Sequence, residues 1–317
     1  MKSNSSLKLN NNRASFLARL LSSDQAQCYL LLAVPIIGFF VFTIYPILWS
    51  AHKAFFYYDM VPANTKFVGI DNFISLFTKD ICYWKAWGVT VKYLLYKLPI
   101  EIPLALLLAT VLSKGLKGSD LIRNLYYLPC VISVAIVGII FSNIFDAFGV
   151  INAWLLNLGL VDGRIDWFGK TGTAMAVLVS GGVWSCFGIN VVYFTAALSN
   201  VPKDLYEAAD IEGAGAVTKF FKITVPMISK VFQTILLMAI NGTLRVGEYI
   251  IVMTNGAPAK TTLSAEAYLM KSFLPGFSDG QNPNIGYGCC MAVVSSIICM
   301  LVGLAYMQAT KKIQDLY

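Results

Sequence analysis

Six long apolar segments alternate with polar connections along the chain. A helix that crosses a bilayer needs about 20 mostly apolar residues. Four segments have that length and contain no charged side chain: Tyr29–Ser50, Leu125–Phe145, Ala174–Leu198 and Gly286–Thr310. Two further segments are apolar but include charged residues, and these are Trp87–Leu112 and Val231–Met253. The pattern predicts an all-α membrane protein, a polytopic bundle of six transmembrane helices.

The composition agrees with a location in the membrane. Hydrophobic residues, counted without glycine, make up 57% of the 317 residues, and charged residues make up only 13%. A soluble domain averages about 45–50% apolar residues with glycine included, and about 25% charged residues. A soluble fold cannot bury so much apolar surface, and a disordered chain requires low hydrophobicity. Both of these classes are therefore excluded.

The Lys and Arg residues outside the predicted spans indicate the orientation of the chain. With the N-terminus inside, the inner segments hold 13 of these residues and the outer loops hold 8. Positive residues are preferentially retained on the cytoplasmic side of a membrane. We therefore expect both termini to be cytoplasmic, with residues 1–28 as an N-terminal segment, 29–310 as the transmembrane domain and 311–317 as a C-terminal tail.

Several kinds of chemistry have no support in the sequence. The net charge is +7, but the basic residues form no stripe along the chain, so no nucleic-acid partner is expected. His52 is the only histidine, and without ligand-spaced neighbours it makes a poor metal site. The GxxxxGK[ST], HExxH and GxSxG motifs are missing. We therefore expect no catalytic residue, no metal and no cofactor in this chain, and predict that it is not an enzyme.

The connection 199–226 is the longest of the inner connections and has the densest charge. Apolar residues recur at i, i+3 and i+4 on both sides of a glycine pair: Leu205, Ala208 and Ala209 before it, and Val217, Phe220 and Phe221 after it. Glycines permit a sharp turn between two such helices. The pattern predicts a helical hairpin on the cytoplasmic face, with both phenylalanines anchored to the bundle. An amphipathic loop lying on the lipid surface is the alternative.

The same connection has a fixed spacing of Glu, Ala, Gly and Pro residues. Glu207-Ala208-Ala209 is followed after three residues by Gly213, and after nine more by Ile223-Thr224-Val225-Pro226. This spacing resembles the EAA loop of the permease subunits of binding-protein-dependent ABC importers, and only Val225 departs from the family pattern, which has leucine there. The resemblance implies that six residues couple the chain to a separate ATPase: Glu207, Ala208, Ala209, Gly213, Ile223 and Pro226.

Four weaker segments resemble the carbohydrate-uptake branch of these permeases. They are Phe67–Phe73, Arg123–Pro129, Gly149–Asn152 and Thr254–Thr262. The resemblance implies a multi-pass protein of the prokaryotic cytoplasmic membrane that forms half of a sugar or oligosaccharide path. It also implies a second permease subunit, a cytoplasmic ATPase dimer that binds ATP and Mg, and a periplasmic or extracellular substrate-binding protein as partners.

Polar residues inside the predicted spans are candidates for a substrate path, because lipid-facing charge is costly. Within Val231–Met253, Arg245 and Glu248 are three residues apart and can pair, and Asn241 lies one turn earlier. The span Ala174–Leu198 adds Trp184, Asn190 and Tyr193. Aromatic rings stack on sugars, and the polar groups bond to hydroxyls. Contact between helices of the bundle is the alternative role for each of these residues. Lys97 and Glu101 are interpreted as an internal pair near the interface.

Two other functions remain open from the sequence. A secondary transporter also has several spans with charges inside them, but it gives no reason for the spacing of the EAA loop. Within the ABC importers, the coupling loop is shared by systems for polyamines, phosphate or glycerol phosphate. Only the weaker segments outside that loop favour a sugar.

Overall fold

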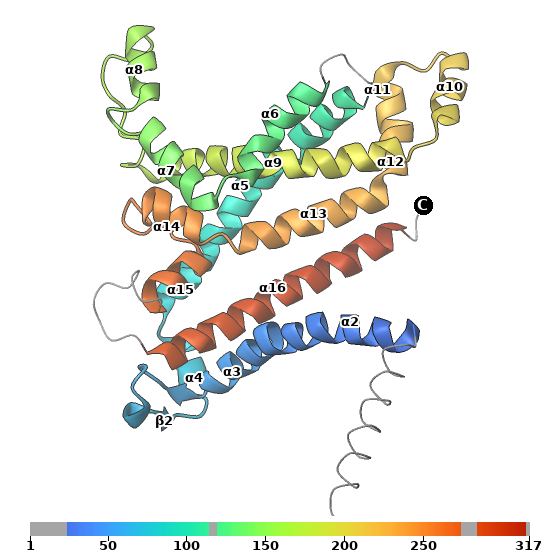
Figure 1. Ribbon diagram of the computed structural model, residues 1–317. Helices are drawn as coiled ribbons and strands as arrows, with labels where there is room; N and C mark the ends of the chain where they lie inside the picture. The colour runs from blue at the N-terminus through green and yellow to red at the C-terminus, as the bar shows by residue number, and fades with distance from the viewer. Residues whose placement is uncertain (1–23, 114–118, 274–283, 315–317) are drawn as a thin grey trace, which may run out of the picture. The chain divides into compact units, whose positions relative to one another are not determined.

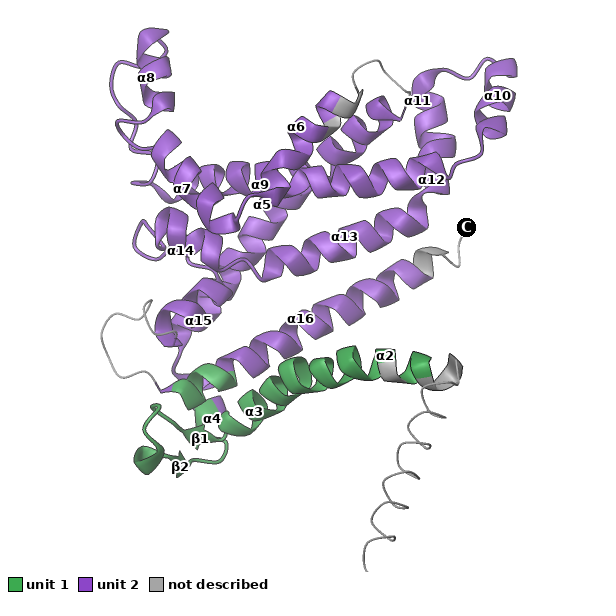
Figure 2. Ribbon diagram, viewed as in Figure 1, with its two compact units in different colours: residues 1–72, 285–290 green, residues 73–284, 291–317 purple. Residues whose placement is uncertain are grey.

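Apart from one pair of two-residue strands, the regular structure in the described part of the chain is helical (Figure 1). The computed structural model describes residues 24–113, 119–273 and 284–314. Most of the expected cytoplasmic N-terminal segment and the end of the expected C-terminal tail lie outside these residues. The chain divides into two units, residues 1–72 with 285–290 and residues 73–284 with 291–317 (Figure 2).

The first unit consists of an apolar helix followed by a small loop structure. Its elements are α2 (Asp24–Phe39), the π-helical turn η1 (Phe40–Ile44), α3 (Tyr45–Lys53), β1 (Phe56–Tyr57), the 3-10 turn η2 (Pro62–Asn64) and β2 (Lys66–Phe67). The two strands pair antiparallel, with Phe56 opposite Phe67. Asn72, at the start of α4 (Asp71–Thr78), donates to the backbone oxygens of Ala54 at 2.8 Å and Phe56 at 3.1 Å. One buried amide therefore fixes the loop that follows the helix.

The second unit contains the remaining helices. They are α5 (Ile81–Leu112), α6 (Ser119–Val131), α7 (Val134–Ile144), α8 (Val150–Asn157), α9 (Thr171–Ser199), α10 (Lys203–Ile211), α11 (Ala216–Lys219), the π turn η3 (Phe220–Thr224), α12 (Val225–Met227), α13 (Ser229–Leu244), α14 (Glu248–Thr254), α15 (Ala265–Phe273) and α16 (Ile285–Gln314), whose first residues belong to the other unit. Helices α8 and α10 lie at opposite ends of the long helix α9 (Figure 1).

Four described helices are long and apolar enough to cross a bilayer: Gln27–Lys53, Ile81–Leu112, Thr171–Ser199 and Ile285–Lys311. Each overlaps one of the predicted spans. Two bent pairs of helices raise the number to six if each pair counts as one span. The structure is therefore that of a polytopic helical membrane protein.

The prediction of one unbroken helix is wrong for two segments. Leu125–Phe145 forms α6 and α7, which meet at 105°. Pro129 cannot donate a backbone hydrogen bond, and Ser133 takes up extended dihedral angles (φ −55°, ψ 136°) before α7. Val231–Met253 is interrupted after Leu244, and α14 begins only at Glu248. These breaks place backbone that is not helical within the apolar bundle.

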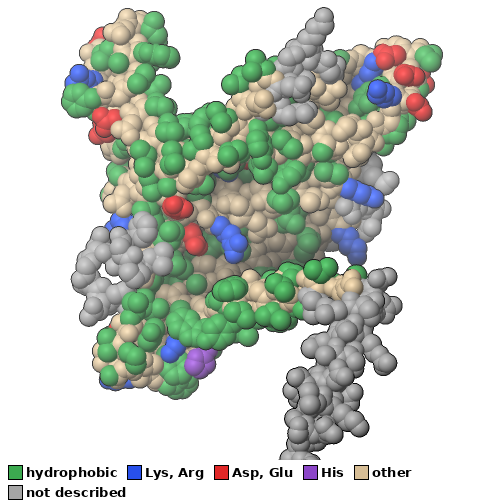
Figure 3. Space-filling view, in the orientation of Figure 1, with side chains coloured by type: hydrophobic (Ala, Val, Ile, Leu, Met, Phe, Trp, Pro, Cys, Tyr) green, Lys and Arg blue, Asp and Glu red, His purple; other side chains and the backbone are tan. Residues whose placement is uncertain are grey.

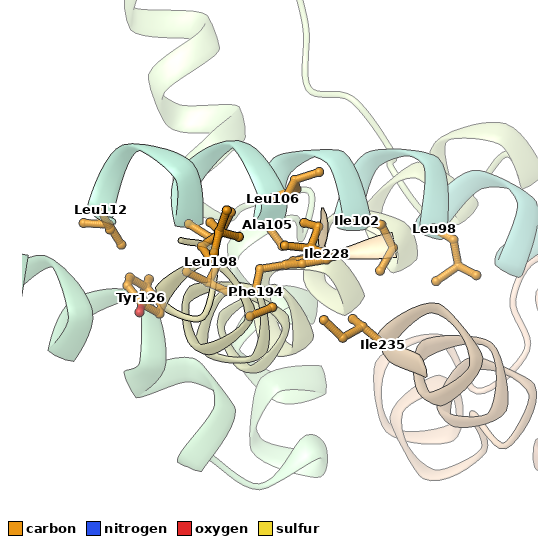
Figure 4. Close-up of a cluster of buried hydrophobic side chains, with 14 residues drawn as sticks. Leu98, Ile102, Ala105, Leu106, Leu112, Tyr126, Phe194, Leu198, Ile228 and Ile235 are labelled. Atoms are coloured by element: carbon orange, nitrogen blue, oxygen red, sulfur yellow. The ribbon is translucent and has the colours of Figure 1, made fainter. Parts of the chain in front are cut away.

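The core of the second unit forms where α5, α6, α9 and α13 meet (Figure 4). Phe194 and Ala105 are completely buried there, and Ile228 and Ile235 are nearly so. Within a membrane, close packing rather than the hydrophobic effect holds helices together, so small residues are favoured between them. A Cβ atom on Gly182 of α9 would lie 2.0 Å from the Tyr93 hydroxyl of α5. The glycine therefore sets how closely these two helices approach.

The turn before α8 is built around a glycine and an asparagine. Asn152, 1% exposed, donates to the Asp146 and Ile165 oxygens at 3.0 and 2.9 Å and accepts from the Ile165 amide at 3.0 Å. A Cβ atom on Gly149 would lie 2.4 Å from the Asn143 oxygen and 2.5 Å from the Ile144 oxygen. No residue larger than glycine fits there without movement of the backbone.

We expect Gly149→Ala to destabilise the protein by about 1–3 kcal/mol, the usual cost of overpacking a filled position. The measurement is thermal unfolding of the purified protein in detergent. Gly163→Ala, in the connection after α8, is the matched control, because a Cβ atom there has no neighbour within 4 Å. Equal melting temperatures for the two variants would contradict the assignment of Gly149 as a steric requirement.

Candidate coupling hairpin and substrate cavity

The connection 199–226 folds as a helical hairpin. Helix α10 ends at Ile211, and Gly213 follows with φ +75°. The Ala214 amide donates to the Ala209 oxygen at 2.8 Å, and the Gly213 amide donates to the Asp210 oxygen at 3.1 Å. These two bonds form a Schellman motif, which requires a left-handed residue at the position of Gly213. The predicted turn at this glycine therefore has a specific backbone geometry.

Side-chain contacts hold the two arms of the hairpin together. The Tyr206 hydroxyl of α10 lies 2.8 Å from the Thr224 hydroxyl at the end of the second arm. Lys219 of α11 forms an ion pair with Asp210 of α10. Figure 3 shows a group of charged side chains over α10, whereas hydrophobic side chains dominate over α9. The hairpin is therefore a polar structure at one end of an apolar bundle.

Only one of the two phenylalanines anchors the hairpin to the bundle. Phe220 is half-buried and packs against the core cluster of α5, α9 and α13. Phe221 is 64% exposed and Val217 is 72% exposed. The prediction that both phenylalanines are anchored is wrong, because adjacent residues of a helix point about 100° apart and Phe221 leaves the face that Phe220 buries.

The motif residues divide between the outer surface of the hairpin and its inner side. Glu207, Ala208, Gly213 and Pro226 are exposed, whereas Ala209 is buried and Ile223 is half-buried. The exposed residues offer a carboxylate and a small side chain to another molecule. The inner two pack within this chain and keep the hairpin in place.

The hairpin continues directly into a helix of the bundle. The segment Ala216–Met227 meets α13 at 74°, and the bend lies at Ile228, which is 1% exposed in the core. Helix α13 then runs to Leu244, where it borders a cavity of about 400 Å³. Hairpin and cavity are thus connected by one helix.

Side chains from α5, α7, α9, α13 and α14 line this cavity. Four of the six residues that were predicted for a substrate path are among them: Asn190, Tyr193, Arg245 and Glu248. Asn241 instead lines a neighbouring cavity of about 380 Å³ between α13 and α16, which Arg245 also borders. A third cavity, of about 310 Å³, joins Arg245 to Glu266 of α15. Arg245 therefore lies where three cavities meet.

Trp184 does not line any of these three cavities. Its ring lies 5.6 Å from that of Phe141 and packs in a hydrophobic cluster with α7 and α14. The predicted pairing of Arg245 with Glu248 is also not among the ion pairs of the described residues. Arg245 caps the end of α13 and Glu248 starts α14, so the two residues do not share a helical face.

A buried network of charged and polar groups forms one wall of the cavity. The Lys97 ammonium lies 3.0 Å from Glu101 Oε2 and donates to the Thr243 hydroxyl at 3.3 Å. The Asn190 side chain donates to Glu101 Oε1 at 2.7 Å. Lys97 and Glu101 are 5% and 1% exposed and lie at the middle of α5. The predicted internal pair is confirmed, and it lies at the middle of α5 rather than near either end of that helix.

Comparison with known proteins identifies the family. Residues 101–314 match the family described as "Binding-protein-dependent transport system inner membrane component". The chain belongs to this family. Two Bacillus subtilis relatives are each 34% identical over 90% of this chain: "Probable ABC transporter permease protein YesP", of which 91% is covered, and "Arabinooligosaccharides transport system permease protein AraP", of which 88% is covered.

The fold of this permease matches a solved transporter structure. A chain of a bacterial ABC transporter involved in the import of the acidic polysaccharide alginate aligns with a TM-score of 0.78 and 22% identity. The alignment covers 94% of this permease and 99% of that chain. The family match and the two relatives confirm the resemblance inferred from the sequence. The protein is a membrane transport component and not an enzyme.

Sequence reasoning gave Lys97 and Glu101 only a structural role and did not consider Thr243. The signal for the first two was available, because charges inside an apolar span face the bundle interior or a water-filled cavity. A single threonine near a helix end has no such signal. Its position in this permease follows only from the way α13 packs against α5.

Proposed function

We propose that this chain is one of two permease subunits of an ATP-driven importer for a sugar or an oligosaccharide. In this proposal the chain has six spans, both termini are cytoplasmic, and residues 29–310 form the transmembrane domain in a prokaryotic cytoplasmic membrane. A separate ATPase dimer binds ATP and Mg, and an external substrate-binding protein delivers the solute. The family and the name of the relative AraP support this assignment.

The observation that carries the proposal is the continuity between hairpin and cavity. The exposed Glu207 and Ala208 lie on α10, and the second arm of the same hairpin runs through Ile228 into α13, which borders the cavity. A partner that holds the hairpin can therefore act on the cavity wall. In this proposal Glu207, Ala208, Ala209, Gly213, Ile223 and Pro226 couple the chain to the ATPase.

The cavity has the chemistry that a neutral polyhydroxylated solute needs. Arg245 donates hydrogen bonds, Glu248 accepts them, and Tyr193 offers an aromatic face. Positive and negative groups are present together. An ion of one sign is attracted by one group and repelled by the other, whereas a neutral solute can form hydrogen bonds with both. This mixture favours a sugar over the alternative solutes, a polyamine, phosphate or glycerol phosphate.

Purification in mild detergent tests the proposal. We expect an ATPase, a second permease and a binding protein to copurify, and the binding protein to be stabilised in a thermal-shift panel by arabino-oligosaccharides or another sugar. The panel also contains spermidine, phosphate and glycerol 3-phosphate, and a shift with one of these alone would replace the sugar by that solute. Uptake that persists with an inactive ATPase would instead indicate a secondary transporter.

The double variant Asn241→Ala/Arg245→Ala is expected to reduce uptake about tenfold or more. Loss of one hydrogen bond to a charged group accounts for that factor. The measurement is uptake of the sugar into vesicles at equal amounts of assembled transporter. Thr234→Ala on the same helix is the control, because its exposed hydroxyl bonds only to the Lys230 oxygen. Unaltered uptake in the double variant would remove α13 from the path.

A further inference from the structure

The ion pair between Lys97 and Glu101 is difficult to explain by stability alone. Removing two charges from water costs free energy that their attraction often fails to recover, and apolar replacements of similar size are often as stable. Both side chains are nevertheless almost completely buried in the bundle. Charged residues inside membrane helices are costly and usually mark a functional site. The network therefore calls for a functional explanation.

The network holds two helices to α5 with unequal hydrogen bonds. The bond from Asn190 of α9 to Glu101 is 2.7 Å long, whereas the bond from Lys97 to Thr243 of α13 is 3.3 Å long. A longer hydrogen bond is weaker. The glycine contact at Gly182 adds a close approach between α5 and α9. Of the two attachments, the one to α13 is therefore the easier to break.

Helix α13 brings movements of the hairpin to this bond. Thr243 lies next to the last residue of α13, and Ser229 at the other end follows the bend to the hairpin. Fourteen residues separate them, which corresponds to about 21 Å along a helix. Rigid helices are one of the physical means by which distant sites are coupled. A displacement of the hairpin therefore displaces Thr243 as well.

A solute bound in the cavity can also affect the hydrogen bond between Lys97 and Thr243. Lys97, Asn190 and Thr243 all line it. An ammonium group has three donors, and Glu101 and Thr243 are its partners among the described residues. A hydroxylated solute in the cavity can accept from the ammonium or compete with Thr243 for it. A bound solute therefore weakens the hydrogen bond that connects α5 to α13.

We propose that Lys97 and Thr243 are a pair of positioning residues whose hydrogen bond links occupation of the cavity to the position of the coupling hairpin. This inference rests on the proposed function. The bond lets α5 hold α13 in one position, and a solute or a hairpin movement releases it. The pair acts through α13 and does not itself take part in ATP hydrolysis.

The test uses the complete transporter in lipid vesicles and compares ATP hydrolysis with and without loaded binding protein. The load is arabino-oligosaccharides, or whichever panel compound stabilises the binding protein. Thr243→Val removes the hydroxyl at nearly constant volume. We expect the ratio of stimulated to basal ATP hydrolysis to fall about tenfold, because one charge-assisted hydrogen bond is lost. Thr243→Ser is expected to retain the ratio, and Thr234→Val on the same helix is the matched control.

A second variant separates this role from a structural one. Lys97→Met/Glu101→Leu replaces the pair by apolar side chains, and we expect an assembled transporter with the same loss of the ratio. A normal ratio in Thr243→Val and in this double variant overturns the inference while the proposed function stands. Wild-type transporter without any stimulation by loaded binding protein overturns the proposed function, and the inference with it.

Discussion

A Gly213→Val substitution is expected to abolish substrate-stimulated ATP hydrolysis while the assembled transporter remains in the membrane. Gly213 adopts φ +75°, and the Schellman motif after α10 depends on that conformation. A side chain in the left-handed region costs about 1–2 kcal/mol, and a branched one at least as much. The population of the native hairpin conformation therefore falls about tenfold or more. ATP hydrolysis by purified transporter in vesicles, with and without loaded binding protein, measures the effect.

Two variants isolate the backbone as the cause. A Cβ atom at Gly213 has no neighbour within 4 Å, so crowding is not involved. Gly215→Val is the matched control, because Gly215 is equally uncrowded but has φ −69° and extended dihedral angles that valine adopts readily. Gly213→Asn should recover part of the stimulation, since asparagine tolerates the left-handed region. Normal coupling in Gly213→Val would remove the turn from the mechanism.

The apolar pattern predicted the long apolar helices but not how two of the predicted spans are bent. A run such as Leu125–Phe145 has the same hydropathy whether it forms one helix or two at 105°. Pro129 lies inside α6, shortly before the break, but prolines also lie inside the long helix α5, at Pro99 and Pro103. The surrounding packing decides between a tolerated proline and a break. A single sequence does not contain that information.

The two parts of the candidate site differed in how far the sequence predicted them. The hairpin is a local structure, so the spacing from Glu207 to Pro226 was sufficient to predict its turn at Gly213. The cavity is assembled from five helices that are far apart in the sequence. Asn190 and Arg245 were found because polar groups inside spans are conspicuous. The role proposed for Thr243 depends on its hydrogen bond with Lys97, which the sequence does not show.

Segments outside the EAA loop that resembled carbohydrate permeases contain residues that fix turns. Asn72 holds the loop after α3, Gly149 and Asn152 hold the turn before α8, and the hydroxyls of Thr254 and Thr262 lie 3.0 Å apart in the loop after α14. None of these residues lines the cavity of about 400 Å³ that is the candidate substrate site. Such segments therefore indicate the fold of the family more directly than they indicate the solute.

The largest loss of stability is expected from Glu101→Leu. This change leaves the Lys97 ammonium buried without its counterion, and breaking one side of a buried ion pair costs about 3–5 kcal/mol. The amide of Asn190 loses its acceptor as well, at about 1–3 kcal/mol when a buried donor is left unsatisfied. We expect little assembled transporter in the membrane and a markedly lower melting temperature in detergent.

The double variant Lys97→Met/Glu101→Leu decides whether charge or packing is responsible. It removes both charges and keeps the volume, so most of the stability lost in Glu101→Leu should return. Full recovery is not expected, because Asn190 still lacks its acceptor. If the double variant were as unstable as Glu101→Leu, the pair would stabilise the bundle by its own attraction. Recovery of stability without recovery of coupling would mean that the cavity retains a costly pair of charges because transport requires it.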